Sequence, residues 1–424
     1  MRERKRLLLL AATTGYQTRV FAERARALGY ELVLATDRCH SLDDPWGDHA
    51  IPVHFHVPEE ALPHIEAAGP FDAVLAVGDR PTLAAALAAE RLGVPYHPPA
   101  AVTACRDKFL ARKRYEAAGL PVPAYFRVAV EDSPGEAARR APYPCVLKPP
   151  GLSGSRGVIR ADNQPQFLEA FRRITALLDS ADVRVMREER NRYIQVESYI
   201  PGREYAIEGV VTGGRLHALA RFDKPDPLEG PFFEETIYIT PSREPREVQE
   251  ALIAAAGRAV RALGLAHGPV HAEMRYNDGG VWMLEVAARP IGGLCAKALR
   301  FNGGMPLEEL LLRHAVGEDV SDARLDGPAS GVMMIPIPRE GVYEVVTGVE
   351  EAAAVSDIEE VLITAKPGQR IVPLPEGSSY LGFIFARGDS PEVVERALRA
   401  AHAELRFEIA GTLRVVQTLA RGGT

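Results

Sequence analysis

The segment Tyr143–Gly157 places a lysine just before a glycine-rich stretch. Lys148 ends a short apolar run, and three glycines, two serines and an arginine follow before the next apolar run. Backbone N–H groups in such a loop can surround phosphate oxygens, while the lysine supplies a positive charge. The segment is not a Walker A loop, because it lacks the G-K-[ST] ending and does not open into a helix. We interpret it as a phosphate-binding loop, with a flexible surface turn as the alternative.

Two glutamates, Glu197 and Glu204, bracket the connection between two predicted strands. These strands cover Tyr193–Ile200 and Glu204–Thr212. The backbone of such a connection can hydrogen-bond the edge of an adenine, and a carboxylate there can accept hydrogen bonds from ribose hydroxyls. Taken alone, the pattern also fits a solvated strand end.

A third set of charged residues lies on the next pair of predicted strands. Glu273 and Glu285 occupy successive strands, and Arg289 follows four residues after Glu285. Apolar neighbours indicate that the second strand is buried, and buried carboxylates require a compensating positive charge. In a phosphate site, Mg²⁺ is the positive charge most suited to compensate such carboxylates. The alternative interpretation is a surface ion pair between Glu285 and Arg289. Gly292 and Gly293 could then bring backbone N–H groups up to a substrate carboxylate.

Substrate-binding residues are expected in the long, Pro-rich segment 222–236 and around it. Loops of this content often line a binding site, and a structural loop with exposed acids is the alternative. Glu234 or Glu235 could hold a substrate ammonium group, and Tyr238 and His271 could line the pocket. A histidine on a strand is also often no more than a hydrogen-bonded core residue.

Strands and helices must bring these residues together, and the sequence pattern predicts where they lie. Strands are predicted at Leu7–Ala12, Leu32–Ala35 and Ala73–Val77, alternating with helices at Arg19–Leu28 and Pro81–Leu92. This alternation indicates a parallel sheet that is covered on both faces. A lone glycine, Gly15, at the first strand-to-helix turn excludes a dinucleotide-binding fingerprint.

Later in the chain, paired strands dominate before a final α+β unit. Further strands and helices are predicted at Asp107–Ala118, Leu216–Phe222, Arg246–Leu263, Val270–Tyr276, Gly280–Val286, Pro306–Val316, Gly331–Ile337, Tyr380–Ala386 and Pro391–Leu405. A chain of 424 residues has the length of about three domains. We place them at 1–100, at 101–320 with a lid subdomain at about 125–200, and at 321–424.

Composition narrows the class of protein. The net charge of −7 disfavours a broad surface for nucleic acid, and no apolar stretch is long enough to span a membrane. The apolar run near the N-terminus is too short for a typical signal peptide. None of the cysteines has metal-ligand spacing, so we expect free thiols and a cytoplasmic protein. These cysteines are Cys39, Cys105, Cys145 and Cys295.

Together the charged residues carry a resemblance to a known superfamily. They follow one another in this order: Lys108, Lys148, Glu197, Glu204, Glu273, Glu285 and Arg289. Over residues 5–316 this order resembles the ATP-grasp carboxylate–amine ligases. The segments 285–293 and 331–406 are most similar to the L-amino-acid ligases, which make dipeptides. The resemblance implies a Rossmann-like parallel-sheet domain, a two-subdomain ATP-grasp fold and a C-terminal α+β domain, in a biotin-carboxylase-like architecture.

The resemblance also implies a role for each site residue. It assigns ATP phosphates to Lys108, Lys148, Gly154, Ser155 and Gly157, adenine to Glu197, Ser198 and Ile200, and ribose to Glu204. It assigns one or two Mg²⁺ ions, with Mn²⁺ as an alternative, to Glu273 and Glu285, and the transferring phosphoryl group to Arg289. Many relatives have Asn two residues after the second metal glutamate, where this chain has Ala287. The occupancy of a second metal position therefore remains open.

The activity implied is activation of a carboxylate, expected to be an L-amino acid, as an acyl-phosphate that an amine then attacks. The substrates are thus a small carboxylate and a small amine, with neither nucleic acid nor membrane as partner and a homodimer expected by analogy. One alternative is a biotin-carboxylase-like enzyme that activates bicarbonate, although the chain has no biotin-carrier lysine motif. Another is a non-catalytic ATP-binding protein on a ligase scaffold, against which the intact Glu273, Glu285 and Arg289 set argues.

Overall fold

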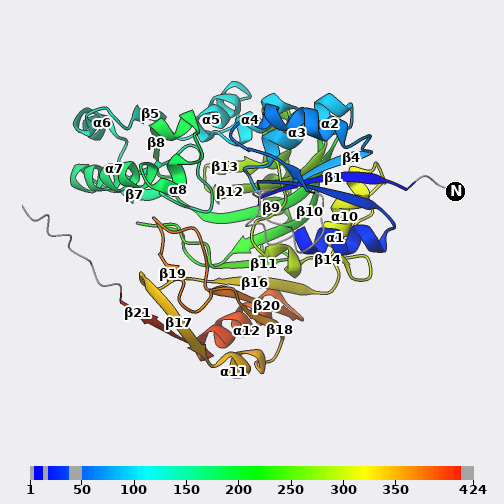
Figure 1. Cartoon of the computed structure of the whole chain (residues 1–424). Helices are drawn as coiled ribbons and strands as arrows, with labels where there is room; N and C mark the ends of the chain where they lie inside the picture. Colours follow the sequence, from blue (N-terminus) through cyan, green and yellow to red (C-terminus); the bar gives the residue numbers. More distant parts are fainter. Residues whose placement is uncertain (1–3, 13–17, 38–49, 412–424) are drawn as a thin grey trace, which may run out of the picture.

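The computed structural model describes residues 4–12, 18–37 and 50–411. Gly15 and Cys39 lie outside these ranges. Figure 1 shows the blue N-terminal unit and the green lid on opposite sides of a central sheet, with the orange and red C-terminal unit below them.

The N-terminal unit is built on a parallel sheet with the order β3-β2-β1-β4. Its strands are β1 (Arg6–Ala11), β2 (Glu31–Thr36), β3 (Ile51–Pro52) and β4 (Ala73–Val77), and its helices are α1 (Thr18–Ala27), α2 (Leu62–Ala67), α3 (Thr82–Leu92) and α4 (Pro99–Cys105). Alternate leucines of β1 point to opposite faces of the sheet. Leu8 packs into one core with α3, and Leu7 packs into another with α1. This confirms the predicted parallel sheet with both faces covered.

The lid carries an antiparallel sheet with the order β5-β8-β6-β7. Its strands are β5 (Tyr125–Ala129), β6 (Cys145–Lys148), β7 (Ile159–Ala161) and β8 (Tyr193–Ser198), and its helices are α6 (Pro134–Arg140), α7 (Gln164–Leu178) and α8 (Ala181–Arg184). Helix α5 (Lys108–Ala117) precedes the lid and packs against α4. The side chain of Asn163 caps α7 by accepting a hydrogen bond from the Gln166 N–H. Phe167, Phe171 and Ile174 form the buried stripe that seats α7 on the sheet.

The central sheet is antiparallel and runs through both the core and the C-terminal unit. Its strands in spatial order are β13 (Gly280–Ala287), β12 (Gly268–Asn277), β9 (Arg203–Thr212), β10 (Arg215–Lys224), β11 (Ile237–Thr240), β16 (Ala329–Ile335), β20 (Gly382–Gly388) and β18 (Ile358–Ile363). The β11–β16 pair, in register at Ile237 and Met333, joins the two parts. Helix α9 (Arg246–Leu263) covers one part of the sheet and stops at Gly264, which has a positive φ of 79°.

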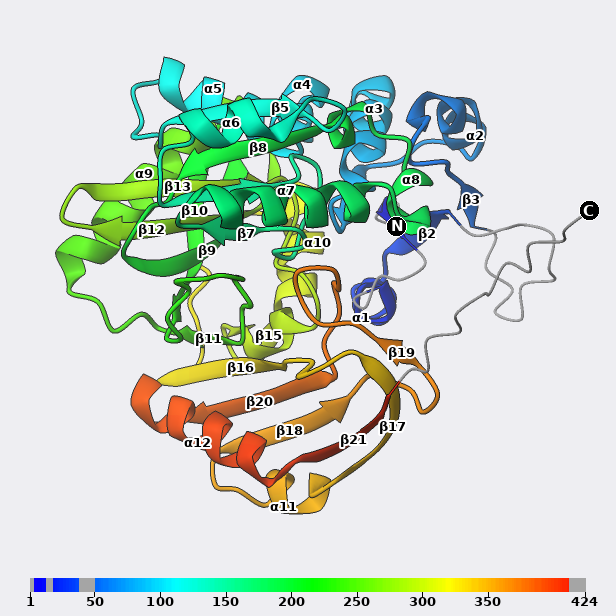
Figure 2. The same ribbon diagram turned by 90° about the vertical axis from the view of Figure 1, so that its left-hand side faces the viewer.

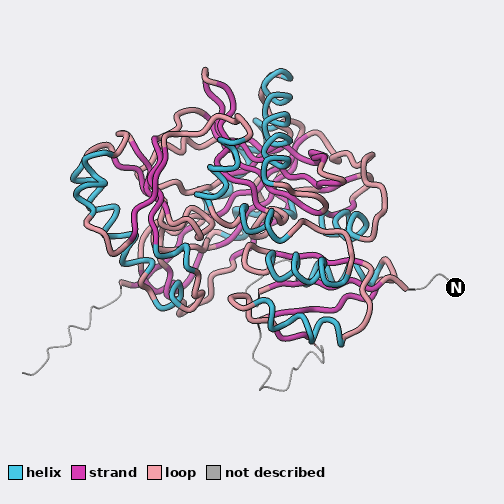
Figure 3. The backbone as a smooth tube through the Cα atoms, turned by 90° about the horizontal axis from the view of Figure 1, so that it is seen from above, coloured by secondary structure: helices cyan, strands magenta, loops and turns pink. Residues whose placement is uncertain are grey.

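The C-terminal unit adds a smaller sheet and two helices. The smaller sheet has the order β19-β17-β21. These elements are β17 (Gly341–Thr347), α11 (Val349–Ala353), β19 (Arg370–Ile371), α12 (Pro391–Glu404) and β21 (Arg406–Ala410). The core and the C-terminal unit are connected through β14 (Arg300–Phe301), β15 (Met305–Pro306) and α10 (Leu307–Ala315). Figure 3 shows the helices packed around the strands.

Most predicted elements occur in the structure with ends shifted by one or two residues. Helix α9 has the predicted bounds, whereas β20 begins at Gly382 and excludes the predicted Tyr380, which lines the central cavity. Among the described helices, none has the length and apolarity to cross a membrane. Cys105, Cys145 and Cys295 are free thiols, as expected.

Candidate active site

A cavity of about 330 Å³ lies between the N-terminal unit, the lid, the core sheet and the C-terminal unit. The site residues predicted from the sequence line this cavity, except for Gly157 and for Glu234, which was the alternative to Glu235. The N–H of Gly157 instead donates a hydrogen bond of 2.8 Å to the carbonyl oxygen of Pro375. Residues that lie far apart in the sequence are therefore brought to one place.

One end of the cavity is cationic. Lys148 ends β6, and Lys108 is the first residue of α5, where Asp107 caps the helix. The Lys108 ammonium donates to the Leu152 carbonyl oxygen at 2.7 Å and lies 3.2 Å from the Glu285 carboxylate. Since Leu152 belongs to the glycine-rich loop, Lys108 connects that loop to the core sheet.

The glycine-rich loop has a backbone that most side chains avoid. Gly154, Ser155 and Gly157 have φ values of 64°, 55° and 74°. A non-glycine residue with positive φ is uncommon, and strain of this kind is often found at ligand-binding loops. The loop thus has the conformation expected where backbone N–H groups surround an anion.

Lys148 is held by a buried ion-pair network that the sequence did not reveal. Its ammonium lies 2.5 Å from the carboxylate of Glu197, which also accepts two hydrogen bonds from Arg112, at 2.7 and 3.2 Å. Burial alone would raise the pKa of Glu197, but Arg112 and Lys148 outweigh it and hold that pKa at about 2. Burial lowers the pKa of Lys148 to about 8, against the opposing charge of Glu197. Arg112 lies one turn after Lys108 on α5, a spacing that places both side chains on one helix face.

This network bears on the role implied for Glu197. The carboxylate of Glu197 is bonded to Arg112, Lys148 and Gln195. It therefore holds these side chains in place and is not free to bind adenine. The adenine contact that the resemblance implies is then left to the backbone of Glu197, Ser198 and Ile200, and it stays a prediction.

The predicted metal ligands Glu273 and Glu285 are register partners on β12 and β13. The register between these strands shifts at Glu273 and Met274, where one strand carries an extra residue. Without that bulge the turn at Asn277 and Gly280 would place Leu284 opposite Glu273. A bulge beside an active site commonly re-aims a side chain in this way.

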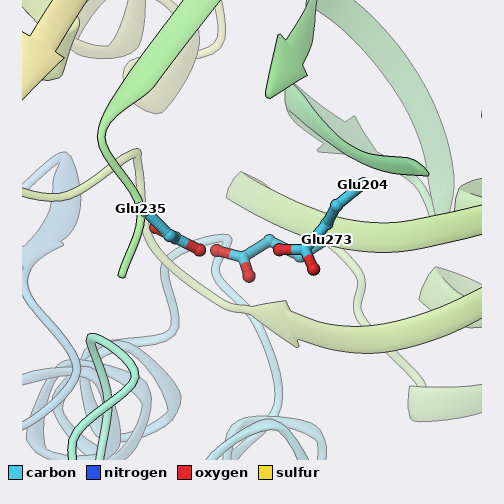
Figure 4. A group of neighbouring side chains, drawn as sticks. All are labelled: Glu204, Glu235 and Glu273. Atoms are coloured by element: carbon cyan, nitrogen blue, oxygen red, sulfur yellow. The ribbon is translucent and has the colours of Figure 1, made fainter. Parts of the chain in front are cut away.

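Glu273 also belongs to a second group of carboxylates. One oxygen each of Glu204, Glu235 and Glu273 lies within 4.8 Å of the others. Figure 4 shows the three side chains pointing toward one another. The ammonium of Lys224 lies 2.8, 2.6 and 3.4 Å from these three carboxylates. Burial opposes the charge on Lys224, but the three carboxylates raise its pKa well above the ordinary value. Glu204, to which a ribose contact was assigned, also accepts a hydrogen bond from Arg275 at 3.0 Å.

His271 connects Glu273 to another buried carboxylate, Glu208. The His271 Nδ1 lies 3.0 Å from Glu208, and its Nε2 lies 3.4 Å from Glu273. Burial would lower the pKa of His271, but these two carboxylates raise it to about 9. Glu208 further accepts the N–H of Ile291, which precedes Gly292. His271 therefore lines the cavity and is also fully hydrogen-bonded, so both interpretations of this histidine hold.

The predicted catalytic cation Arg289 is paired with a residue of the N-terminal unit. Its guanidinium donates to both oxygens of Asp79, at 3.0 and 3.1 Å. Burial raises the pKa of Asp79, but Arg289 and Lys108 outweigh burial and lower it. Asp79 follows the carboxyl end of β4, which is the end of a parallel sheet where binding residues gather. That position is the sequence signal by which Asp79 could have been found.

Part of the cavity lining is apolar, and some of it comes from the C-terminal unit. The core contributes Phe233 and Tyr238, and the C-terminal unit contributes Met334, Tyr380 and Phe383. The Tyr238 hydroxyl donates to Glu235 at 2.7 Å. A Cβ atom at Gly293 would lie 3.3 Å from the Phe383 ring, so glycine at this position allows the close approach.

The carboxylate and cationic side chains of this cavity fit a nucleoside triphosphate bound with a divalent cation. Carboxylate oxygens on paired strands are the ligand type that Mg²⁺ and Mn²⁺ prefer. Three cationic side chains, Lys108, Lys148 and Arg289, line the same cavity and suit phosphate oxygens. Cys295 also lines it, but burial raises the pKa of its thiol and makes it a poor nucleophile.

Comparison with known families agrees with this geometry. Models of the ATP-grasp N-terminal domain, the ATP-grasp domain and the L-amino acid ligase C-terminal domain 2 match residues 22–96, 141–298 and 333–410. The chain belongs to the ATP-grasp superfamily. The fold is similar to the crystal structure of an L-amino acid ligase from Bacillus licheniformis, with a TM-score of 0.78 and 26% identity over 97% of this chain and 100% of that one.

Curated ATP-grasp relatives are similar over part of their length. Alanine–anticapsin ligase of Bacillus subtilis is 29% identical over 54% of this chain and 50% of its own length. Carnosine synthase 1 of Gallus gallus is 32% identical over 52% of this chain and 24% of its own length. This chain thus spans half or less of these two relatives.

Proposed function

We propose that this protein is an ATP-dependent ligase that joins a carboxylate, an L-amino acid, to the amine of a second amino acid. The observation that carries the proposal is one cavity lined by cationic side chains, a group of carboxylates and apolar side chains. The cationic side chains suit the phosphates of ATP, and the apolar ones suit an organic substrate. Similarity to an L-amino acid ligase over nearly the whole chain supports the substrate class.

In the first step, an oxygen of the substrate carboxylate attacks the γ-phosphorus of ATP and ADP leaves. Lys108, Lys148 and Arg289 neutralise the charge on the phosphate oxygens, and the glycine-rich loop covers them. One or two Mg²⁺ ions held by Glu273 and Glu285 would supply further neutralisation of the phosphates. The products of this step are ADP and an acyl-phosphate.

In the second step, the amine nitrogen attacks the acyl carbon, loses a proton and displaces phosphate. Backbone N–H groups at Gly292 and Gly293 would position the substrate carboxylate, and Glu235 would face the substrate ammonium. Burial and the charge of Glu273 raise the pKa of Glu235, which favours its protonated form. The lid must exclude water throughout, because acyl-phosphates hydrolyse.

The proposal is tested by screening pairs of amino acids for release of ADP and phosphate, with mass spectrometry of the product. The expected result is a dipeptide from at least one pair, in amounts matching the ADP. ATP binding without a product from any pair would overturn the proposal. ATP turnover that requires only bicarbonate would instead indicate a biotin-carboxylase-like reaction.

A further inference from the structure

The segment 372–380, between β19 and β20, contacts two separate parts of the molecule. In Figures 1 and 2 this orange loop rises from the C-terminal unit toward α7 and β7 of the lid. One part of the loop is bonded to the lid, and the next part lines the cavity. It is therefore placed to sense both lid position and cavity contents.

Three groups of the lid are bonded to residues 375 and 376. The guanidinium of Arg173 on α7 donates to both carboxylate oxygens of Glu376, at 2.8 and 2.9 Å. Arg156, in the glycine-rich loop, donates to the Glu376 carbonyl oxygen at 2.8 Å. The N–H of Gly157 donates to the Pro375 carbonyl oxygen at 2.8 Å. These contacts join both the glycine-rich loop and its neighbouring helix to the C-terminal unit.

The same loop reaches the cavity within two residues. Ser378, Ser379 and Tyr380 line it, and the Tyr380 ring centroid lies 6.2 Å from that of Phe383. Gly377 lies between the two parts, and its N–H donates to the Pro373 carbonyl oxygen at 2.9 Å. A Cβ atom at this position would overlap the carbonyl oxygen of Val372, so the tight turn requires glycine. A tight turn transmits a displacement of Glu376 to Ser378 more directly than an extended linker would.

From these contacts we propose that the Arg173–Glu376 pair is a latch that holds the glycine-rich loop closed while Ser378–Tyr380 complete the substrate wall. The inference rests on the proposed function, because an acyl-phosphate intermediate is what makes closure necessary. Arg173 and Glu376 are positioning residues, since neither lines the cavity. The pair is 30% and 41% exposed, and an ion pair of this exposure is weak enough to open in each cycle.

Charge reversal of the pair tests the latch. The variants are Arg173→Glu, Glu376→Arg and the double variant, and the first readout is hydrogen exchange at the Gly157 amide with AMP-PNP and Mg²⁺ bound. Each single variant places like charges together, and we expect exchange to rise about fivefold, the change an exposed ion pair allows. The double variant restores opposite charges and should return exchange toward that of the original chain. Unchanged exchange in the single variants, or none of the rise reversed in the double variant, would overturn the proposal.

A matched control lies on the same helix. Arg172 forms a pair with Glu169 within α7, at 2.6 Å, with both side chains largely exposed. Arg172→Glu introduces the same charge change next to Arg173 and should leave exchange at Gly157 as it was. If charge reversal prevents folding, Glu376→Gln removes the charge while retaining the shape, and it should raise the same exchange rate.

A second readout distinguishes failure of the latch from failure of the proposed function. With a productive amino-acid pair, the single variants should release about fivefold more ADP in excess of product, because water reaches the intermediate. If the original chain makes no amide from any pair, the proposed function fails, and the exchange measurement still decides whether the latch exists. If the original chain makes amide and the ratio of ADP to product does not change in the variants, the latch has no role in excluding water and the proposal is overturned.

Discussion

The guanidinium of Arg289 donates two hydrogen bonds to the carboxylate of Asp79, so a residue of the N-terminal unit orients the predicted catalytic cation of the core. The pair joins the segment that follows β4 to the segment that follows β13. A planar guanidinium held at two points has little freedom to rotate, which suits a cation that must meet a transferring phosphoryl group.

Asp79→Asn should therefore lower turnover without abolishing nucleotide binding. The amide offers one acceptor instead of two and no charge, so Arg289 is less well oriented and the kcat should fall about tenfold. Steady-state kinetics of ADP release, with KM for ATP measured separately, check this. Asp72→Asn, which removes a more exposed pair with Lys5 on the same unit, is the control and should leave kcat unchanged. A kcat for Asp79→Asn equal to that of the control would contradict the orienting role.

Glu197→Gln should destabilise the protein strongly. The substitution leaves Arg112 and Lys148 buried with no carboxylate between them, and breaking a buried pair from one side lowers the free energy of unfolding by about 3 kcal/mol. Urea denaturation followed by circular dichroism measures this change. Glu131→Gln removes an exposed pair with Arg192 and should change the same free energy by less than about 1 kcal/mol. Equal effects of the two substitutions on the free energy of unfolding would mean that the ion-pair network of Glu197 does not stabilise the fold.

Glu285→Gln should keep nucleotide binding and lose turnover. Lys108 and Lys148 still meet the phosphates, but one of the two proposed Mg²⁺ ligands is gone, so ADP release should fall about 100-fold. Calorimetric titration with AMP-PNP and an ADP-release assay over a range of Mg²⁺ concentrations separate the two effects. Unchanged turnover would place the metal site elsewhere, and the group of Glu204, Glu235 and Glu273 would be the first place to look.

Two buried histidines should make the protein less stable in mild acid. Burial lowers the pKa of His97 to about 4 and that of His314 to about 3. The unfolded chain binds protons on these groups below a pKa of about 6.5 and the folded chain does not, so stability falls as pH drops from 7 to 5. Each histidine contributes about 2 kcal/mol to this loss.

Substitution of one histidine tests this pH dependence. His314→Gln cannot titrate, so the difference in unfolding free energy between pH 7 and pH 5 should shrink by about 2 kcal/mol, as measured by urea denaturation at both pH values. His54→Gln changes an exposed histidine and should leave that difference as it was. A pH dependence of the His314→Gln protein that matches the original chain would show that other groups cause the acid sensitivity.

The sequence predicted the elements well, because their periodic patterns are local. The apolar spacing of α9 and its glycine stop are contained in the segment Arg246–Gly264, and the structure has the same bounds. It also brought together most of the named site residues, since all but Gly157 and Glu234 line one cavity. Motif residues could be found in this way because each lies near the end of a recognisable strand or helix.

Register could not be predicted in the same way. A bulge between Ala218 and Ala220 shifts the β9–β10 pairing by one residue and places Lys224 opposite Glu204. Counting from the turn at Gly213 and Gly214 without the bulge would pair Lys224 with Arg203. For this reason the cation at the centre of the group of Glu204, Glu235 and Glu273 was missed.

Long-range partners were missed for a related reason. Arg112 meets Glu197 only through tertiary packing, which no local pattern encodes. The position of Asp79 after β4 indicates a binding residue, but it does not predict that Arg289 is its partner. Glu208 is different, since it lies on the same face of β9 as Glu204, and that period of two was an available signal.

The most direct test of the proposed reaction follows one oxygen atom. An amino acid labelled with ¹⁸O in its carboxylate is supplied with ATP, Mg²⁺ and the amine partner that yields the most product in the screen. If a carboxylate oxygen attacks the γ-phosphorus, one ¹⁸O atom should appear in each released phosphate, and mass spectrometry of the phosphate detects it. Release of unlabelled phosphate during product formation would contradict an acyl-phosphate intermediate and with it the proposed ligase mechanism.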